Sequence, residues 1–153
     1  MSIETDLRAV PVNSLDLSEY TVVQNTATVR ETIDKMRAEK HNCAFILDGE
    51  ALAGVFTDRD VLNKVVDHPE TWDSPITNVM TPNPSSTNAK DATGTGMQMM
   101  EQRRFRNVPV LDGEKVVGNL THFAIIQYLA EQFPNEIYNL PPDPNKIGGR
   151  YGG

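Results

Sequence analysis

The sequence contains an internal repeat, and this duplication restricts the fold more than any other feature of the chain. Residues 64 positions apart match without a gap, as Met36 and Met100 do. The triplet Asp-Gly-Glu occurs at 48–50 and again, in the same register, at 112–114. Further matches are Gly54 with Gly118, Thr57 with Thr121, Ile33 with Met97, Ile46 with Val110, Leu52 with Val116, and Val61-Leu62 with Ile125-Ile126. We therefore expect two copies of one unit, related by pseudo-twofold symmetry.

Each copy is predicted to run strand, helix, hairpin, helix. In the first copy an extended piece at 20–24 precedes a helix whose apolar face has the spacing i, i+4, i+7. Two apolar runs joined by Asp-Gly then indicate a hairpin, and apolar pairs one turn apart from Val61 to Val66 indicate a closing helix. The matching segments of the second copy are an extended piece at 84–88, a helix, the apolar runs 108–111 and 116–120, and a closing helix at 125–130.

Two glycines weaken the helix predicted for the start of the second copy. Gly94 and Gly96 stand where that helix should begin. Inside a helix each glycine costs about 1 kcal/mol relative to alanine. We therefore expect this helix to fray or to begin late.

Chain length limits the domain organisation. With 153 residues, 39% of them apolar, the chain can bury one proper core. A single copy would leave its sheet and helices poorly covered, so we expect one α+β module in which the two copies pack together. The connector at 67–78 is polar and carries Pro69 and Pro75, which is typical of a surface linker. The expected segments are a leader at 1–11, a first repeat at 12–70, a linker at 71–79, a second repeat at 80–133 and a Pro/Gly-rich tail at 134–153.

The charge balance argues against several classes of partner. A net charge of −7 disfavours binding to nucleic acid or to an anionic membrane surface. No stretch approaches the roughly 18 consecutive apolar residues of a membrane span, and the start MSIETDLRAV lacks the features of a signal peptide, so a cytoplasmic protein is expected. The single Cys43 cannot form an internal disulfide and is expected to pack in the core.

The segment Gly-Val-Phe-Thr-Asp-Arg-Asp at 54–60 carries the clearest chemical signal, because a strand is predicted to end at Thr57 and a helix to begin just after it. Free N–H groups at a helix start favour an anion, and Thr57 and Asp60 would add a hydroxyl and a carboxylate. The same two residues can instead cap the helix without any ligand. From these residues alone, both interpretations stay open.

Nothing in the sequence points to catalysis or to a metal site. The histidines His41, His68 and His122 lie in different elements, without companions at metal-ligand spacing. Asp58 and Asp60 are two residues apart at a helix start, so they do not face each other as an acid and a base would. No nucleophile elbow or Walker loop is present. We therefore expect a binding protein that is not an enzyme and that requires no cofactor.

The strand ending in Gly-Val-Phe-Thr-Asp-Arg-Asp after an Asp-Gly hairpin is similar to the CBS domain, and the duplication resembles a tandem CBS pair over residues 12–133. Met80-Thr81-Pro82 and the run Arg106-Asn107-Val108-Pro109-Val110 resemble further motifs of that family. The resemblance implies a cleft between the units that binds AMP, ADP or ATP, with S-adenosylmethionine less favoured. It also implies a homodimer and a separate, unidentified protein that is regulated.

The resemblance also assigns roles to individual residues. Asp60 would accept hydrogen bonds from the ribose hydroxyls, which suits a carboxylate, and Thr57 would lie near the phosphate. Arg104 and Arg106, in the densest basic cluster of the chain, would bind phosphate; the alternative is that this cluster is only a solvated surface stretch. The nucleotide-binding residues expected on this basis are Val55, Thr57, Asp60, Ser85, Arg104 and Arg106.

The symmetry-related site departs from this pattern. Thr121 is kept, but Ala124 stands where the first copy has Asp60, and Asn42 stands where the second copy has Arg106. One nucleotide per chain is therefore expected. The alternative function is a structural or protein-interaction module that binds no nucleotide, in which Thr57 and Asp60 only cap a helix.

Overall fold

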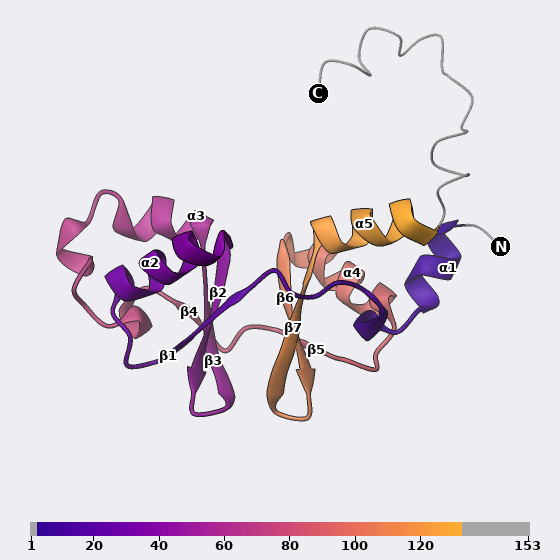
Figure 1. The fold of residues 1–153 in the computed structure, drawn as a ribbon, viewed down its shortest axis with the longest axis horizontal. Helices are drawn as coiled ribbons and strands as arrows, with labels where there is room; N and C mark the ends of the chain where they lie inside the picture. Colours follow the sequence, from indigo (N-terminus) through magenta and orange to yellow (C-terminus); the bar gives the residue numbers. More distant parts are fainter. Residues whose placement is uncertain (1–2, 133–153) are drawn as a thin grey trace, which may run out of the picture.

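The computed structural model describes residues 3–132, so the tail expected at 134–153 lies outside the described residues. The described helices are α1 (Ile3–Ala9), α2 (Val29–Glu39), α3 (Asp58–Asp60), α4 (Thr93–Arg103) and α5 (His122–Gln132). The strands are β1 (Thr21–Gln24), β2 (Cys43–Asp48), β3 (Ala51–Thr57), β4 (Thr81–Pro82), β5 (Thr87–Asn88), β6 (Asn107–Asp112) and β7 (Lys115–Thr121). The α+β class and the tandem organisation expected from the sequence are confirmed (Figure 1).

The sheet carries the pseudo-twofold symmetry of the sequence. Its strand order is β1-β2-β3-β7-β6-β5, with β4 paired to β3, so each end begins with a parallel pair and continues into an antiparallel hairpin. The hairpins share their register, since Cys43 faces Thr57 in one and Asn107 faces Thr121 in the other. The first unit is built from β1, α2, β2, β3 and α3, and the second unit from β5, α4, β6, β7 and α5. The two hairpins stand side by side at the centre of the molecule, with helices on either side (Figure 1).

The expectation that α4 frays or begins late is wrong. The helix begins at Thr93 and includes both glycines. A side chain at Gly96 would bring its Cβ within 2.4 Å of Leu120 Cδ2, and one at Gly94 would lie 3.1 Å from Arg8 Cβ in α1. The absence of side chains lets α4 approach β7 and α1 closely, and this packing outweighs the low helix propensity of glycine.

The two closing helices differ in geometry although their sequences match. In the second unit α5 is a regular α-helix of 11 residues. In the first unit α3 spans three residues and continues as a π-helix at Val61–Val65, closed by a hydrogen bond from the Val66 N–H to the Val61 carbonyl. π-helical turns are rare and occur often at functional sites.

The segments that precede the two units are exchanged between them. Val12, at the start of the first repeat, is fully buried in the core of the second unit. Ile76, which is 64 residues later, is fully buried in the core of the first unit. Equivalent hydrogen bonds fix both: the Val12 N–H donates to the Asp91 carbonyl and the Ile76 N–H donates to the Ala27 carbonyl, each at 2.8 Å. The expectation that the connector is only a surface linker is therefore wrong for Ile76.

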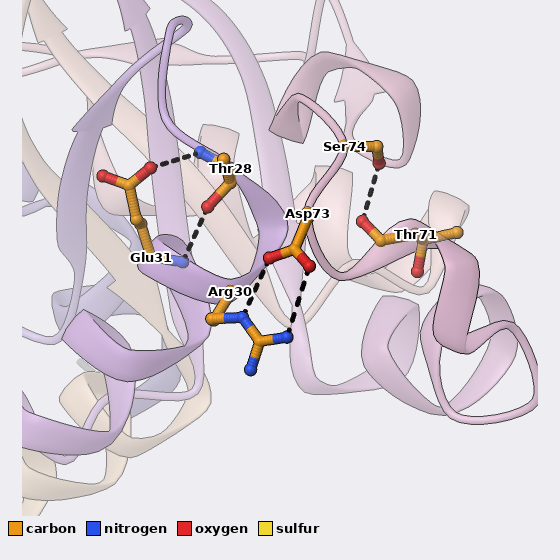
Figure 2. A network of polar contacts seen from close by, with 6 residues as sticks. All are labelled: Thr28, Arg30, Glu31, Thr71, Asp73 and Ser74. Carbon is orange, nitrogen blue, oxygen red and sulfur yellow. Dashed lines mark hydrogen bonds and ion pairs between the residues drawn. The ribbon is translucent and has the colours of Figure 1, made fainter.

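Polar contacts tie the rest of the connector to the start of α2 (Figure 2). The Arg30 guanidinium donates to Asp73 at 3.0 Å and lies 5.3 Å from the centre of the Trp72 ring. The hydrogen bond and the charge of Arg30 lower the pKa of the Asp73 carboxyl. Thr28 caps α2, because its Oγ1 accepts from the Glu31 N–H at 3.1 Å while the Glu31 carboxylate accepts from the Thr28 N–H at 3.2 Å. The connector is thus part of the first unit's structure.

Candidate functional site

Two adjoining pockets lie between the two units, at the strand ends opposite the hairpin turns. Each has a volume of about 190 Å³, and they share Asp58, Arg106 and Asn107. The first pocket is lined by Val55, Thr57, Asp58, Arg59, Asp60, Thr81, Arg104, Phe105, Arg106 and Asn107. The second pocket is lined by Glu19, Asn42, Cys43, Asp58, Arg106, Asn107, Thr121, His122 and Phe123.

The first pocket is lined by charged residues from both units. Thr57 ends β3 and Asp60 ends α3, both in the first unit. Arg104 follows α4 in the left-handed conformation, with φ of 56°, and Arg106 directly precedes β6, both in the second unit. The packing of the two units therefore brings Thr57 and Asp60 of the first unit to one cavity with Arg104 and Arg106 of the second.

Thr57 and Asp60 form a capping box at the start of α3. The Asp60 carboxylate accepts a hydrogen bond from the Thr57 N–H at 3.0 Å, and the Thr57 Oγ1 accepts one from the Asp60 N–H at 3.4 Å. Asp60 Oδ1 also lies 3.2 Å from Lys64 Nζ, and the Asp60 side chain is only 14% exposed. This geometry matches the helix cap that was one of the two interpretations of the sequence. Asp60 also lines the first pocket.

Five of the six residues expected to bind nucleotide line the first pocket, and Ser85 does not. The Ser85 hydroxyl instead accepts a hydrogen bond from Arg103 Nη1 at 3.0 Å. Thr81, which sequence reasoning did not assign to the site, enters the pocket because β4 pairs with β3 through Thr81 and Val55. Its position in the Met80-Thr81-Pro82 motif was the available signal.

The second pocket has different chemistry from the first. Thr121 caps α5, and its Oγ1 accepts from the Ala124 N–H at 3.0 Å, but position 124 supplies no carboxylate. At the position equivalent to Val55 lies Asn119, which is fully buried. Its Nδ2 donates to the Glu19 carbonyl at 2.8 Å and to Asn107 Oδ1 at 2.9 Å, so the amide crosslinks two residues of this pocket.

Cys43 borders the second pocket but is almost fully buried. Burial, reinforced by the negative charges of Asp58 and Asp60, raises the pKa of its thiol well above the usual range. The thiol is therefore protonated at neutral pH and is a poor nucleophile. Cys43 packs in the structure as the sequence predicted.

Two features are absent from the described residues. Within residues 3–132, no three His, Cys, Asp or Glu side chains are grouped so that they could hold a metal ion. None of the helices in that part of the chain has both the length and the apolar character needed to cross a membrane.

Comparison with known proteins gives a consistent result. The CBS domain family matches twice, at residues 12–67 and 76–131. The CBS domain-containing protein CBSCBSPB1 of Arabidopsis thaliana is 29% identical over 111 residues, which are 71% of this chain and 20% of that protein. The meiotically up-regulated gene 70 protein of Schizosaccharomyces pombe is 30% identical over 125 residues, which are 80% of this chain and 17% of that protein. The chain thus spans a fifth or less of the length of these two relatives.

Solved structures share the fold. The structure of CBSX2 in complex with AMP superimposes with a TM-score of 0.68 at 21% identity, covering 80% of this chain and 98% of that one. At this level of identity the likeness establishes the fold alone.

Proposed function

The chain belongs to the CBS domain family as a tandem pair of these domains, and we propose from this premise that it is a non-catalytic sensor of adenine nucleotides. The ligand, AMP, ADP or ATP, binds in the first pocket between the two units. The observation that carries this proposal is the combination of a carboxylate and a hydroxyl from one unit with two arginines from the other. The AMP bound to CBSX2, which shares the fold, supports the same ligand class.

Each group in the first pocket suits one part of a nucleotide. The Asp60 carboxylate accepts hydrogen bonds from vicinal ribose hydroxyls, while Thr57 lies next to the phosphate. Arg104 and Arg106 bind phosphate oxygens, because a guanidinium pairs with two oxygens at once. Val55 borders the adenosine. Binding stiffens the cleft around the ligand, and this change is passed to a separate regulated protein or to another copy of the chain.

The expected stoichiometry is one nucleotide per chain. The second pocket lacks the ribose acceptor, since Ala124 replaces the carboxylate, and Asn42 offers no positive charge where the first pocket has Arg106. A ribose placed against the capping hydroxyl of Thr121 would lack the carboxylate that Asp60 supplies beside Thr57 in the first pocket.

We test the proposal by isothermal titration of the protein with AMP, ADP, ATP, S-adenosylmethionine and adenosine. Saturation by at least one nucleotide, near one per chain, is expected. The double variant Arg104→Ala/Arg106→Ala should weaken AMP binding by at least about tenfold and change adenosine binding much less, because charge-assisted hydrogen bonds to phosphate are lost. Arg37→Ala, on the exposed end of α2, is the matched control. Absence of binding by every nucleotide would contradict the proposal.

The exposed apolar face of the closing helices supports a homodimer. Leu62 is 68% exposed, and its repeat partner Ile126 is 62% exposed, as is Phe123. These helices lie along the same edge of the molecule (Figure 1). Exposed apolar patches of this kind often mark protein contacts, and a twofold dimer would cover the face with its own copy.

The double variant Leu62→Asp/Ile126→Asp should therefore be monomeric where the unmodified protein is dimeric, because a dimer would bury unpaired carboxylates. Light scattering coupled to gel filtration measures the mass. Val117→Asp, an exposed apolar position on β7, is the control and should leave the dimer intact. A monomeric unmodified protein would remove the basis for the dimer.

The second candidate function is a structural or protein-interaction module that binds no nucleotide. The observation that favours it is the capping box, which occupies Thr57 and Asp60 without any ligand. Under the nucleotide-binding function the loss of the Asp60 carboxylate lowers ligand affinity, whereas under the second function it lowers only the stability of the fold.

A further inference from the structure

Lys64 joins two walls of the first pocket although it does not line the pocket itself. Its Nζ lies 3.2 Å from Asp60 Oδ1 and donates a hydrogen bond to the Val79 carbonyl at 3.0 Å. Asp60 forms one wall of the pocket, and Val79 is two residues before Thr81, which forms another. One ammonium group therefore fixes the carboxylate relative to the strand β4 that borders it.

The Asp60 carboxylate is held at both oxygens. Lys64 pairs with Oδ1, and the Thr57 N–H donates to Oδ2 at 3.0 Å. Each oxygen of an ionised carboxylate has more than one acceptor position, so both oxygens can still accept from a ligand hydroxyl. A carboxylate that is fixed in advance does not lose side-chain freedom when a diol binds, which strengthens the discrimination between one hydroxyl and two.

The second unit provides an internal comparison. The positions equivalent to Asp60 and Lys64 are Ala124 and Tyr128, so both members of the ion pair are missing together. Tyr128 packs against the core of the second unit. An uncharged residue at this position therefore suffices to pack a closing helix against its unit. The unit that has the lysine is also the unit that has the carboxylate.

We infer that Lys64 is a positioning residue, which orients the Asp60 carboxylate so that the first pocket selects ribonucleotides over 2′-deoxyribonucleotides. This inference rests on the proposed function, since it concerns the sugar of the nucleotide bound there. Lys64 acts through Asp60 and through the β4 edge, and it is not among the residues that line the pocket.

The test compares AMP with 2′-deoxy-AMP by isothermal titration of the unmodified protein and of Lys64→Met, which keeps length but removes the charge. The unmodified protein should prefer AMP by about tenfold, the effect of a hydrogen bond to a charged group. In Lys64→Met the preference should fall to about twofold or less, mainly through weaker AMP binding. Both ligands are titrated into the same protein, so a loss of folded protein cancels in the ratio.

Two further variants separate positioning from a structural effect. Lys64→Arg retains a cation able to reach the carboxylate and should restore most of the preference for AMP. Lys35→Met is the matched control, because Lys35 Nζ also donates to a backbone carbonyl of the first unit, that of Val22, but has no part in the pocket. The preference of Lys35→Met for AMP over 2′-deoxy-AMP should equal that of the unmodified protein.

The outcomes distinguish the two levels of the argument. The positioning role is wrong, while nucleotide binding stands, if Lys64→Met keeps the preference for AMP. The same conclusion follows if the unmodified protein binds AMP and 2′-deoxy-AMP equally well. If the unmodified protein binds neither ligand, the proposed function fails, and the role of Lys64 fails with it.

Discussion

Asp60→Ala is expected to weaken AMP binding by about a hundredfold, because two charge-assisted hydrogen bonds to the ribose are lost together. The same change removes one half of the capping box and the partner of Lys64, so the free energy of unfolding should fall by about 0.5–2 kcal/mol. The effect on affinity is therefore far larger than the effect on stability. Isothermal titration measures the first quantity, and urea unfolding followed by circular dichroism measures the second.

The chain offers a matched control for this variant. Glu31 has the same role in the capping box of α2 that Asp60 has in α3, and it lies outside both pockets of the cleft (Figure 2). Glu31→Ala should lower the free energy of unfolding by a similar amount and leave AMP binding unchanged. If Asp60→Ala and Glu31→Ala behave alike in both measurements, Thr57 and Asp60 only cap a helix, and the structural or protein-interaction function is the correct one.

Ile76→Ala is expected to destabilise the protein by about 2–5 kcal/mol, the range for large-to-small changes at buried sites. Ile76 belongs to a polar, proline-containing connector, where a substitution would ordinarily have little effect. In the structure its side chain is fully buried with Val29 and Phe56 in the core of the first unit. Removing three carbons leaves a cavity in that core, which urea unfolding detects as a lower midpoint.

The control for this prediction is Val117→Ala, an apolar truncation at a site that is 39% exposed. It should change the free energy of unfolding by no more than about 0.5 kcal/mol. Val12→Ala, the repeat equivalent of the connector variant, should destabilise the protein through the core of the second unit. If Ile76→Ala were as stable as Val117→Ala, the exchange of segments between the units would contribute nothing to the free energy of unfolding.

Much of the fold was predictable because the signals are local. Asp-Gly between apolar runs predicted both hairpins, and Gly49 and Gly113 adopt the left-handed conformation that these turns need, with φ of 64° and 65°. The apolar spacing predicted α2, and the duplication predicted a second unit with the same strand order. The helix cap at Thr57 was also readable, since a capping box spans only four residues.

The errors arose where contacts between distant segments decided the structure. The glycines of α4 suggested a frayed helix, but their close approach to Leu120 and to α1 stabilises it. The polar connector suggested a surface linker, but Ile76 completes a core. No periodic signal marked α1, which packs against α4 through Arg8, whose guanidinium forms a 2.9 Å ion pair with Glu101.

The candidate site divides in the same way. That Thr57 and Asp60 are close follows from sequence alone, and their roles and those of Arg104 and Arg106 in binding a nucleotide stay predictions. That these arginines share a pocket with Asp60 follows from the packing of the two units. Ser85 lies outside that pocket and accepts a hydrogen bond from Arg103.

The amino-acid sequence is enough to show that the chain is a duplication, that each copy runs strand, helix, hairpin, helix, and that the two copies differ at the position of Asp60. Hydrogen bonds and apolar periodicity within a few residues are enough to specify these features. Three features became visible in the tertiary structure. Each leading segment packs in the core of the other unit, and the closing helix of the first unit contains a π-helical turn. Lys64 links Asp60 to the carbonyl of Val79. These features depend on how two similar surfaces pack against each other, and the packing of residues far apart in the chain leaves no local pattern in the sequence.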